Sequence, residues 1–183
     1  MSFRRRSLIQ FVLAMLLPAR AAVCAGELAL SETSLLGGRV KMLLPRDFEP
    51  LDDQMLRVKY PTGDRPALVY TDKTTEVNVA LQHTQYQMSA EKMVEECAEA
   101  IVAFKSGFPA WSEWFRSELH PINGRPFLLF ELRTPALDTR VRNIMAVTSL
   151  DNRMLVISFN VTRELERQWL AAGNRIIESI VLQ

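Results

Sequence analysis

Short hydrophobic runs, several of them alternating with polar residues, recur between residues 39 and 82. Such patterns are typical of strands that bury one face. In the last run, Val77, Val79 and Leu81 lie on one face of the strand, and polar Asn78 and Gln82 lie on the other. The predicted strands of this half are residues 40–44, 55–60, 67–71 and 76–82, the last two forming a hairpin, with a turn-rich corner PRDFEPLDD after the first.

The periodicity then changes to that of a helix. Apolar residues recur every three or four positions from Met93 onward, Ser89 is suited to cap the helix, and Gly107 follows the last turn. We therefore predict an amphipathic helix over residues 89–107, with its apolar stripe against a sheet. Cys97 lies within that stripe, which favours a buried structural cysteine over a reactive thiol.

Strand-like patterns return in the second half and predict an antiparallel meander. Asn123–Gly124 suits a two-residue hairpin loop, and Asp151–Arg153 suits a tight turn. The segment TPALDT is typical of a loop. The strands predicted here are residues 111–122, 127–132, 140–150 and 154–161.

A second amphipathic helix is predicted after the last strand, with Thr162 as its N-cap. Its apolar face consists of Leu165, Trp169, Ala172, Ile176 and Ile180. The predicted fold class is therefore α+β, an antiparallel sheet packed with two main helices. Because hairpins join the strands, a doubly wound nucleotide fold is disfavoured. The globular domain is expected over residues 39–183, after a short lead-in at 26–38.

Residues 1–25 have the three regions of a cleavable secretory signal peptide. Three arginines at positions 4–6 precede the apolar run from Leu8 to Pro18, and Val23 and Ala25 suit a cleavage site before Gly26. We expect an exported, periplasmic protein with no transmembrane segment once the signal is removed. Two alternatives are a lipoprotein signal that modifies Cys24, and a twin-arginine signal.

Composition narrows the function classes. Signal removal takes away four of the 22 basic residues and none of the 21 acidic ones, so the mature chain has a net charge of −3. That balance disfavours nucleic acid as a partner. Of the two cysteines, only Cys97 remains after cleavage, so no intramolecular disulfide is expected.

No sequence motif points to a catalytic, metal or cofactor site. His83 and His120 are the only histidines, and no cysteine pair lies near them. The sequence contains no nucleophile elbow, dinucleotide fingerprint or P-loop. We therefore expect no cofactor and no enzyme activity. An uncharacterised enzyme remains an alternative.

Two segments are candidate partner-binding surfaces. The first is an aromatic cluster after the first helix, where an exposed indole would suit a protein contact. The second is a loop followed by arginines that alternate on one strand face, which would suit a carboxylate-rich partner. Core packing and a solvated strand face are the respective alternatives. The candidate residues are Trp111, Trp114, Phe115, Leu137, Asp138, Arg140 and Arg142.

The run VKMLLPRDFEPLDDQMLRVKYPTGDRPALVYTDKTTEVNVAL resembles the opening of bacterial proteins of the DcrB and PsbP-like superfamily. The later INGRPFLLFEL segment and the terminal helix fit the same plan, so the resemblance spans residues 39–182. Relatives include photosynthetic accessory subunits, a small-GTPase-binding import factor, envelope proteins and chaperones of secretion-system effectors. The resemblance implies a PsbP-like sandwich used to bind proteins.

These observations lead to one functional expectation. The protein is expected to be a non-enzymatic, exported binding module whose partner is another protein, in one form an immunity or accessory protein for a secretion-system effector. A carrier of a small apolar ligand is the alternative from another class, which a deep apolar cavity would favour.

Overall fold

A seven-stranded sheet in the order β3-β4-β5-β9-β8-β7-β6 forms the centre of the molecule, and all its neighbouring strands are antiparallel. The computed structural model describes residues 28–60, 65–136 and 139–183, so the predicted signal peptide lies outside the described residues. Its strands are β3 (Glu49–Pro50), β4 (Leu68–Thr71), β5 (Val77–Gln87), β6 (Glu113–Ile122), β7 (Arg125–Pro135), β8 (Arg140–Leu150) and β9 (Arg153–Thr162).

The hairpins predicted from turn residues are confirmed. Asn123 and Gly124 join β6 to β7 with φ of 47° and 78°, and Asp151 and Asn152 join β8 to β9 with φ of 51° and 56°. Positive φ at both central residues matches the right-handed twist of the flanking strands, and Asn, Asp and Gly tolerate it best.

A second, small sheet has the order β1-β2-β10, with β1 at Leu30–Leu35, β2 at Val40–Pro45 and β10 at Val181–Leu182. A short 3-10 helix, η1 (Leu36–Gly38), connects β1 to β2. The lead-in predicted at residues 26–38 therefore has to be corrected, because β1 pairs with β2 along its whole length. The two-residue strand β10 was not predicted.

Residues 55–60 do not form the predicted strand: residues 55–59 belong to a helix, α1 (Asp53–Lys59), and Tyr60 follows its last turn. The side chain of Asp52 accepts a hydrogen bond from Met55 N at 2.8 Å and so caps the first turn. No residue of α1 is buried. These residues pair with no strand of either sheet, so the local cap at Asp52 is enough to favour a helix here.

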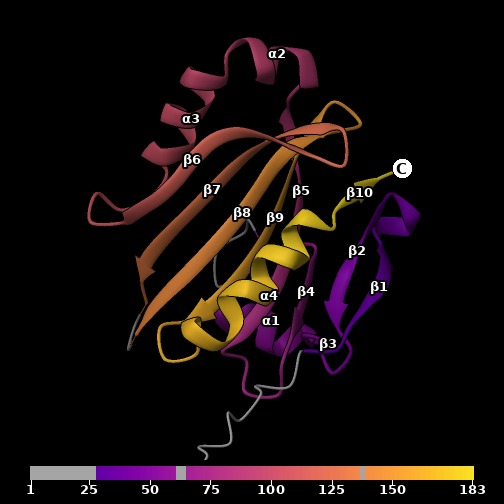
Figure 1. Cartoon of the computed structure of the whole chain (residues 1–183), viewed down its shortest axis with the longest axis vertical. Coiled ribbons are helices and arrows are strands. Elements are labelled where there is room, and N and C mark those ends of the chain that lie inside the picture. Colours follow the sequence, from indigo (N-terminus) through magenta and orange to yellow (C-terminus); the bar gives the residue numbers. More distant parts are fainter. Residues whose placement is uncertain (1–27, 61–64, 137–138) are drawn as a thin grey trace, which may run out of the picture.

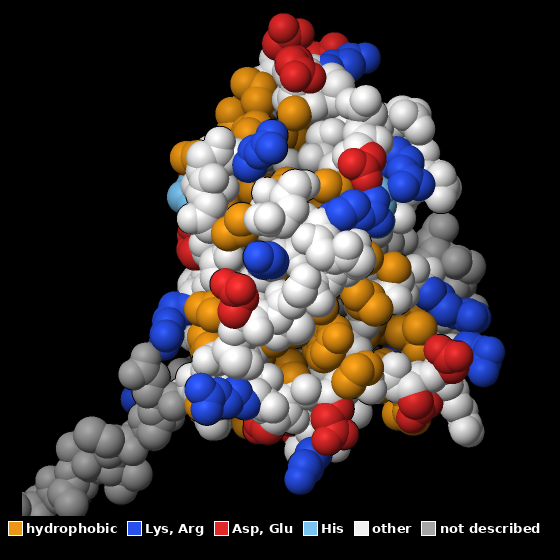
Figure 2. Space-filling model, turned by 90° about the vertical axis from the view of Figure 1, so that its right-hand side faces the viewer, with side chains coloured by type: hydrophobic (Ala, Val, Ile, Leu, Met, Phe, Trp, Pro, Cys, Tyr) orange, Lys and Arg blue, Asp and Glu red, His pale blue; other side chains and the backbone are white. Residues whose placement is uncertain are grey.

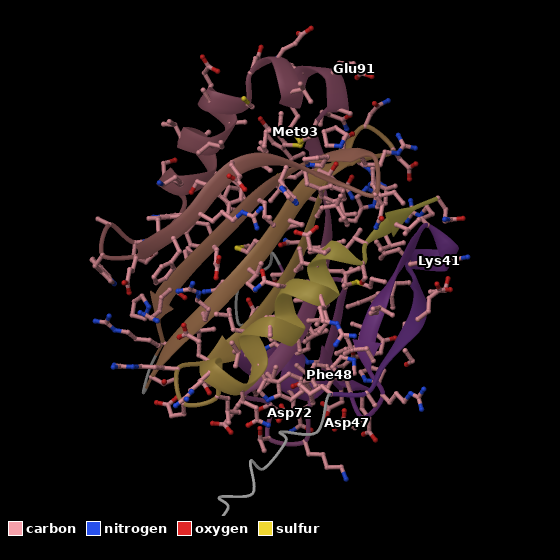
Figure 3. The ribbon with its side chains drawn as sticks, in the orientation of Figure 1. Lys41, Asp47, Phe48, Asp72, Glu91 and Met93 are labelled. Atoms are coloured by element: carbon pink, nitrogen blue, oxygen red, sulfur yellow. The ribbon has the colours of Figure 1, made fainter. Side chains whose placement is uncertain are left out.

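The first long helix is capped by Ser89 as predicted but divides at Glu96 into α2 (Ala90–Glu95) and α3 (Cys97–Ser106). Met93 of α2 is buried and points towards the sheet, whereas Glu91 lies on the outer side (Figure 3). Cys97 is half-buried, so the expectation of full burial is wrong. Ile101 and Phe104 of α3 nevertheless pack against the smaller core with Cys97, so the predicted stripe faces the sheet.

The terminal helix, α4 (Glu166–Glu178), begins after Leu165, so the prediction of Thr162 as its N-cap is wrong. Thr162 is instead the last residue of β9, where it pairs with Val141 of β8. The apolar face of α4 was predicted correctly at Trp169, Ala172 and Ile176, which are buried.

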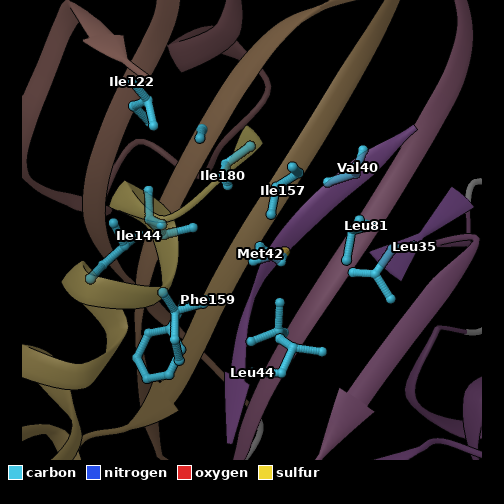
Figure 4. Close-up of a cluster of buried hydrophobic side chains, with 14 of the residues drawn as sticks. Leu35, Val40, Met42, Leu44, Leu81, Ile122, Ile144, Ile157, Phe159 and Ile180 are labelled. Atoms are coloured by element: carbon cyan, nitrogen blue, oxygen red, sulfur yellow. The ribbon is translucent and has the colours of Figure 1, made fainter. Parts of the chain in front are cut away.

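Helix α4 and the small sheet cover one face of the large sheet, and α2 and α3 cover part of the other (Figure 1). Side chains from β2, β5, β8, β9 and the end of α4 converge in the larger core (Figure 4). The smaller core lies between α2, α3 and the strands β6 to β9. The predicted α+β class with two main helical layers is thus confirmed.

The side of the molecule drawn in Figure 2 carries Lys and Arg side chains interspersed with Asp and Glu, with hydrophobic side chains between them. Within the described ranges, no helix combines the length and hydrophobicity that crossing a membrane requires.

Candidate binding groove

The face of the large sheet that carries α2 and α3 is only partly covered, and a groove runs along its centre. Three rows of side chains, each contributed by β5, β9 and β8, form the floor because the strands pair in register. The rows are Asn78–Asn160–Asn143, Ala80–Ser158–Met145 and Gln82–Val156–Val147. Successive rows lie about 7 Å apart, two residues along the strands. The floor therefore changes from polar to apolar along its length.

Hydrogen bonds organise the polar end of the groove. Asn160 Nδ2 donates to Asn78 Oδ1 at 2.8 Å and to Ser158 Oγ at 3.2 Å. Asn143 Nδ2 donates to Thr134 Oγ1 at 3.0 Å and to Val141 O at 2.9 Å. The asparagine row is thus held in place by its own contacts, with further polar atoms left facing the groove.

Tyr60, at the end of α1, lines the same end together with Pro66, Pro135 and Ala136. Burial raises the pKa of the Tyr60 phenol, because the phenolate would be poorly solvated there. Lys59 is the one charged residue in the described lining, and its Nζ donates to Thr75 O at 2.5 Å. The polar end therefore offers mainly neutral groups.

Helix α3 roofs the apolar end, where Ala100, Ala103 and Phe104 face the sheet across the groove. Methionines supply an unusual share of this lining, and their flexible thioether side chains adapt to irregular apolar ligands. The remaining described apolar lining consists of Tyr86, Met88, Phe108, Leu128, Met145, Val147, Met154 and Val156.

The polar end has a volume of about 610 Å³ and the apolar end about 500 Å³. Gln82, Met145 and Val156 line both, so the two ends form one continuous groove that is open to solvent. Such a volume suits a small ligand or a short segment of a chain.

The three aromatic residues predicted to bind a partner have different environments. Trp111 is 75% exposed. Trp114 packs edge-on against Phe108 and Phe130, with ring centroids 5.5 Å and 6.0 Å apart. Phe115 is the extra residue of a bulge in β6, and it is partly exposed. Of the two indoles in this cluster, only that of Trp111 is available for a partner.

The two predicted arginines have different environments, and the expectation has to be corrected for Arg142 alone. Arg142 is 7% exposed, and its guanidinium donates from Nε and Nη2 to Glu131 Oε1 at 3.0 Å and 2.5 Å. Its Cζ also lies 3.3 Å from the centroid of the Phe115 ring. Arg142 therefore already has a carboxylate partner within the chain. Arg140 is exposed, and Leu137 and Asp138 lie outside the described residues.

Glu166 and Arg133 extend the ion pair between Arg142 and Glu131. Glu166 of α4 lies 3.7 Å from Arg142 Nη1 and accepts from Arg133 Nη2 at 3.0 Å. The hydrogen bond to Glu166 is the main cause that raises the pKa of Arg133. These charges join α4 to the sheet and lie on the face opposite the groove. They have a structural role.

No group of three or more His, Cys, Asp or Glu side chains in the described part of the chain is placed to hold a metal ion. The groove offers apolar surface for burial at one end and neutral hydrogen-bonding groups at the other.

No protein-family model matches the sequence, and no curated protein matches it. A solved structure, the cyanobacterial PsbP (CyanoP) of Synechocystis, superposes with a TM-score of 0.57 at 14% identity, covering 91% of this chain and 99% of that one. The chain has the PsbP-like fold. The PsbP-like arrangement also matches a Bacteroides thetaiotaomicron protein with a TM-score of 0.51 at 12% identity, covering 83% of this chain and 48% of that one.

The Ran-binding protein Mog1p of Saccharomyces cerevisiae superposes with a TM-score of 0.48 at 12% identity, over 85% of this chain and 96% of that one. At these identities the likeness concerns the PsbP-like fold alone. The match to the cyanobacterial PsbP confirms, for the fold, the resemblance inferred from the sequence.

Sequence reasoning did not find the groove. Alternation in residues 76–82 assigns Asn78 and Gln82 to the face away from the core, and that assignment is correct. Only the register of β5, β9 and β8 brings Asn78 beside Asn160 and Asn143, and the sequence carries no signal for that register.

Proposed function

We propose that this protein is a non-catalytic, exported binding module that holds an amphipathic small molecule in the groove, with the apolar chain of the ligand beneath α3. One observation carries the proposal: a continuous groove whose floor changes from three asparagines to an apolar, methionine-rich lining. A ligand with one polar and one apolar end would satisfy both linings at once.

The shape of the groove favours this ligand over a wholly apolar one. A carrier of an apolar molecule needs an enclosed cavity, because any apolar surface left in water gains nothing from binding. This groove is open and polar at one end. An amphipathic molecule can leave its polar end near solvent and still bury its chain.

The test is calorimetric titration of the purified protein with single-chain alkyl ligands of increasing chain length, each below its micelle concentration. Affinity should rise about fourfold for each added methylene until the apolar end is filled, since burial of one CH₂ contributes about 0.8 kcal/mol. Affinity that does not change with chain length would contradict the proposal.

Two matched variants test where the alkyl chain of the ligand lies. Ala103→Trp places a large side chain where Ala103 lines the apolar end, and it should abolish the dependence on chain length. Ala98→Trp adds the same side chain to an exposed position on α3 outside the groove lining, and it should leave binding unchanged. Equal binding by both variants would exclude the groove beneath α3 as the site.

A protein partner is the second candidate function, favoured by the exposure of Trp111 and by the free outer edge of β6. In the described sheet β6 pairs only with β7, so its other edge has open backbone groups. An effector-directed immunity or accessory role would use this surface, and the exposed Arg140 of the second predicted segment is a further candidate contact. A photo-crosslinking residue at position 111, but not at exposed Glu32, should capture one defined partner in the native host.

Export completes the proposal. Cleavage after Ala25 would release the protein into the periplasm, and N-terminal sequencing from the native host should begin near Gly26. Recovery of Met1 would contradict export by this signal. Lipid on Cys24 would establish the lipoprotein alternative.

A further inference from the structure

The asparagine row keeps hydrogen-bonding capacity that the fold does not use. Asn160 Nδ2 is engaged with Asn78 Oδ1 and with Ser158 Oγ. Among the described residues, Asn78 Nδ2 donates to no acceptor and Asn160 Oδ1 accepts from no donor. One free donor and one free acceptor therefore lie side by side on neighbouring strands, where β5 and β9 pair.

Ser158 strengthens this observation because its side chain is almost fully buried. The residue is 8% exposed, and its Oγ lines the groove. It accepts a hydrogen bond from Asn160, but no acceptor for its own O–H lies among the described residues. A buried hydroxyl normally finds an acceptor, so its hydrogen is available to a ligand in the groove.

The third asparagine repeats the pattern on β8. Asn143 Nδ2 is held by Thr134 Oγ1 and by backbone carbonyls. Its Oδ1 and the Thr134 hydroxyl hydrogen have no partner in the described part of the chain. The polar end thus holds both free donors and free acceptors on neighbouring strands.

These free groups are neutral, and that restricts the ligand. The Lys59 ammonium, the one charge in the described lining, already donates to Thr75 O. An ammonium group placed on the row would lose water without gaining an opposite charge, and the one cation that a carboxylate could meet there, Lys59, already interacts with Asp72 and Glu76. A hydroxyl donates one hydrogen bond and accepts up to two, so several adjacent hydroxyls match a row that holds both free donors and free acceptors. The ring of Tyr60 and the side chains of Pro66 and Pro135 provide apolar surface beside it for C–H groups.

We propose that the asparagine row and Ser158 bind the hydroxyl groups of a neutral sugar, so that the ligand of the groove is a glycolipid with an uncharged sugar head. This inference rests on the proposed function, which places the apolar chain beneath α3.

The experiment compares three ligands that share a twelve-carbon chain and differ in the head: dodecyl maltoside, dodecanoate and dodecyltrimethylammonium. Each is titrated calorimetrically into the purified protein below its micelle concentration. Dodecyl maltoside should bind at least about tenfold more tightly than either charged ligand, because only its head pairs with the row.

Two variants remove single groups from the row. Asn78→Ala and Ser158→Ala should each weaken dodecyl maltoside about three- to tenfold and leave the affinity for dodecanoate unchanged. Asn174→Ala is the matched control, since Asn174 lies on α4 and donates to Leu170 O. Thermal midpoints identify any loss of fold, and Ser158→Ala, which removes one oxygen, keeps the test valid if Asn78→Ala is unstable.

The outcomes separate the two proposals. Equal affinity for the three heads, with a dependence on chain length, would overturn the sugar site and leave the proposed function standing. Tighter binding of either charged head would also overturn it. If no ligand binds with a dependence on chain length, the proposed function itself fails.

Discussion

Arg140 and Arg142 show how much the environment of one residue depends on its position in the fold. They alternate along β8 and share a face of the strand. Arg142 lies beneath the first turn of α4, where Glu131 and Glu166 surround its guanidinium. Arg140 is at the strand end and remains exposed. The same residue type is thus a structural ion-pair partner at one position and a surface charge at the other.

Arg142→Met should lower the free energy of unfolding by about 3 kcal/mol, because it leaves the half-buried Glu131 carboxylate without its partner. Arg140→Met is the matched control and should change it by less than about 0.5 kcal/mol. Urea denaturation measures both. Equal values for the two variants would show that the ion pair does not stabilise the fold.

Tyr60 should make stability depend on alkaline pH. Its pKa is raised above the ordinary value of 10.0 by burial, so the folded state holds the phenolic proton more tightly than the unfolded chain does. Stability from this group is full below pH 10 and is lost as the pH rises through the raised pKa. Absorbance titration should show a late phenolate step that Tyr60→Phe removes. A titration curve that keeps this step in the variant would assign it to another tyrosine.

At the scale of elements, α4 approaches β9 closely because it presents a glycine to the sheet. A Cβ atom at Gly173 would lie 2.4 Å from Cδ1 and Cε1 of Phe159, well inside van der Waals contact. Phe159 is fully buried in the larger core. The helix is therefore positioned by the absence of one side chain.

Gly173→Ala should lower the free energy of unfolding by about 1–3 kcal/mol, since neither the helix nor the Phe159 ring has room to move. Gly107→Ala is the comparison, because its added Cβ would come no closer than 3.4 Å to Phe104 O. That variant should stay within about 0.5 kcal/mol of the parent. A neutral Gly173→Ala would show that α4 can shift to accept a methyl group.

At the scale of the whole molecule, the β6–β7 turn links the large sheet to α4 and to the small sheet. Asn123 Nδ2 donates to Glu178 O at 3.2 Å and to Ile180 O at 2.9 Å. Glu178 ends α4, and Ile180 precedes β10, which pairs with β2. One side chain therefore fixes where the helix ends and the last strand begins.

Asn123→Gly should lower the free energy of unfolding by about 1–2 kcal/mol, because it keeps the turn conformation and removes both hydrogen bonds. Asn123→Ala should lower the free energy of unfolding by about 1 kcal/mol more than Asn123→Gly does, since alanine is strained at a φ of 47°. Denaturant titration of the two variants separates the contribution of the two hydrogen bonds from the strain in the turn. If Asn123→Gly equals the parent, the link contributes nothing.

Local patterns predicted most of the strands, because alternation and turn residues act over a few positions. They failed at residues 55–60, where Asp52 caps a helix over a sequence with strand-like composition. They also failed at Thr162, because pairing with Val141 extends β9 past a residue that suits a helix cap. In the first case a local side-chain cap outweighed the strand-like composition, and in the second a contact with a strand distant in sequence outweighed the preference of threonine for a helix cap.

The sequence by itself determined the antiparallel α+β plan, the core faces of β5 and α4, and the Asn123–Gly124 turn, because each depends on periodicity or on residues next to one another. The tertiary structure alone decided the partner of Arg142 and the alignment of Asn78, Asn160 and Asn143. These residues are far apart in the chain, and strand register, which the whole core selects, brings them together.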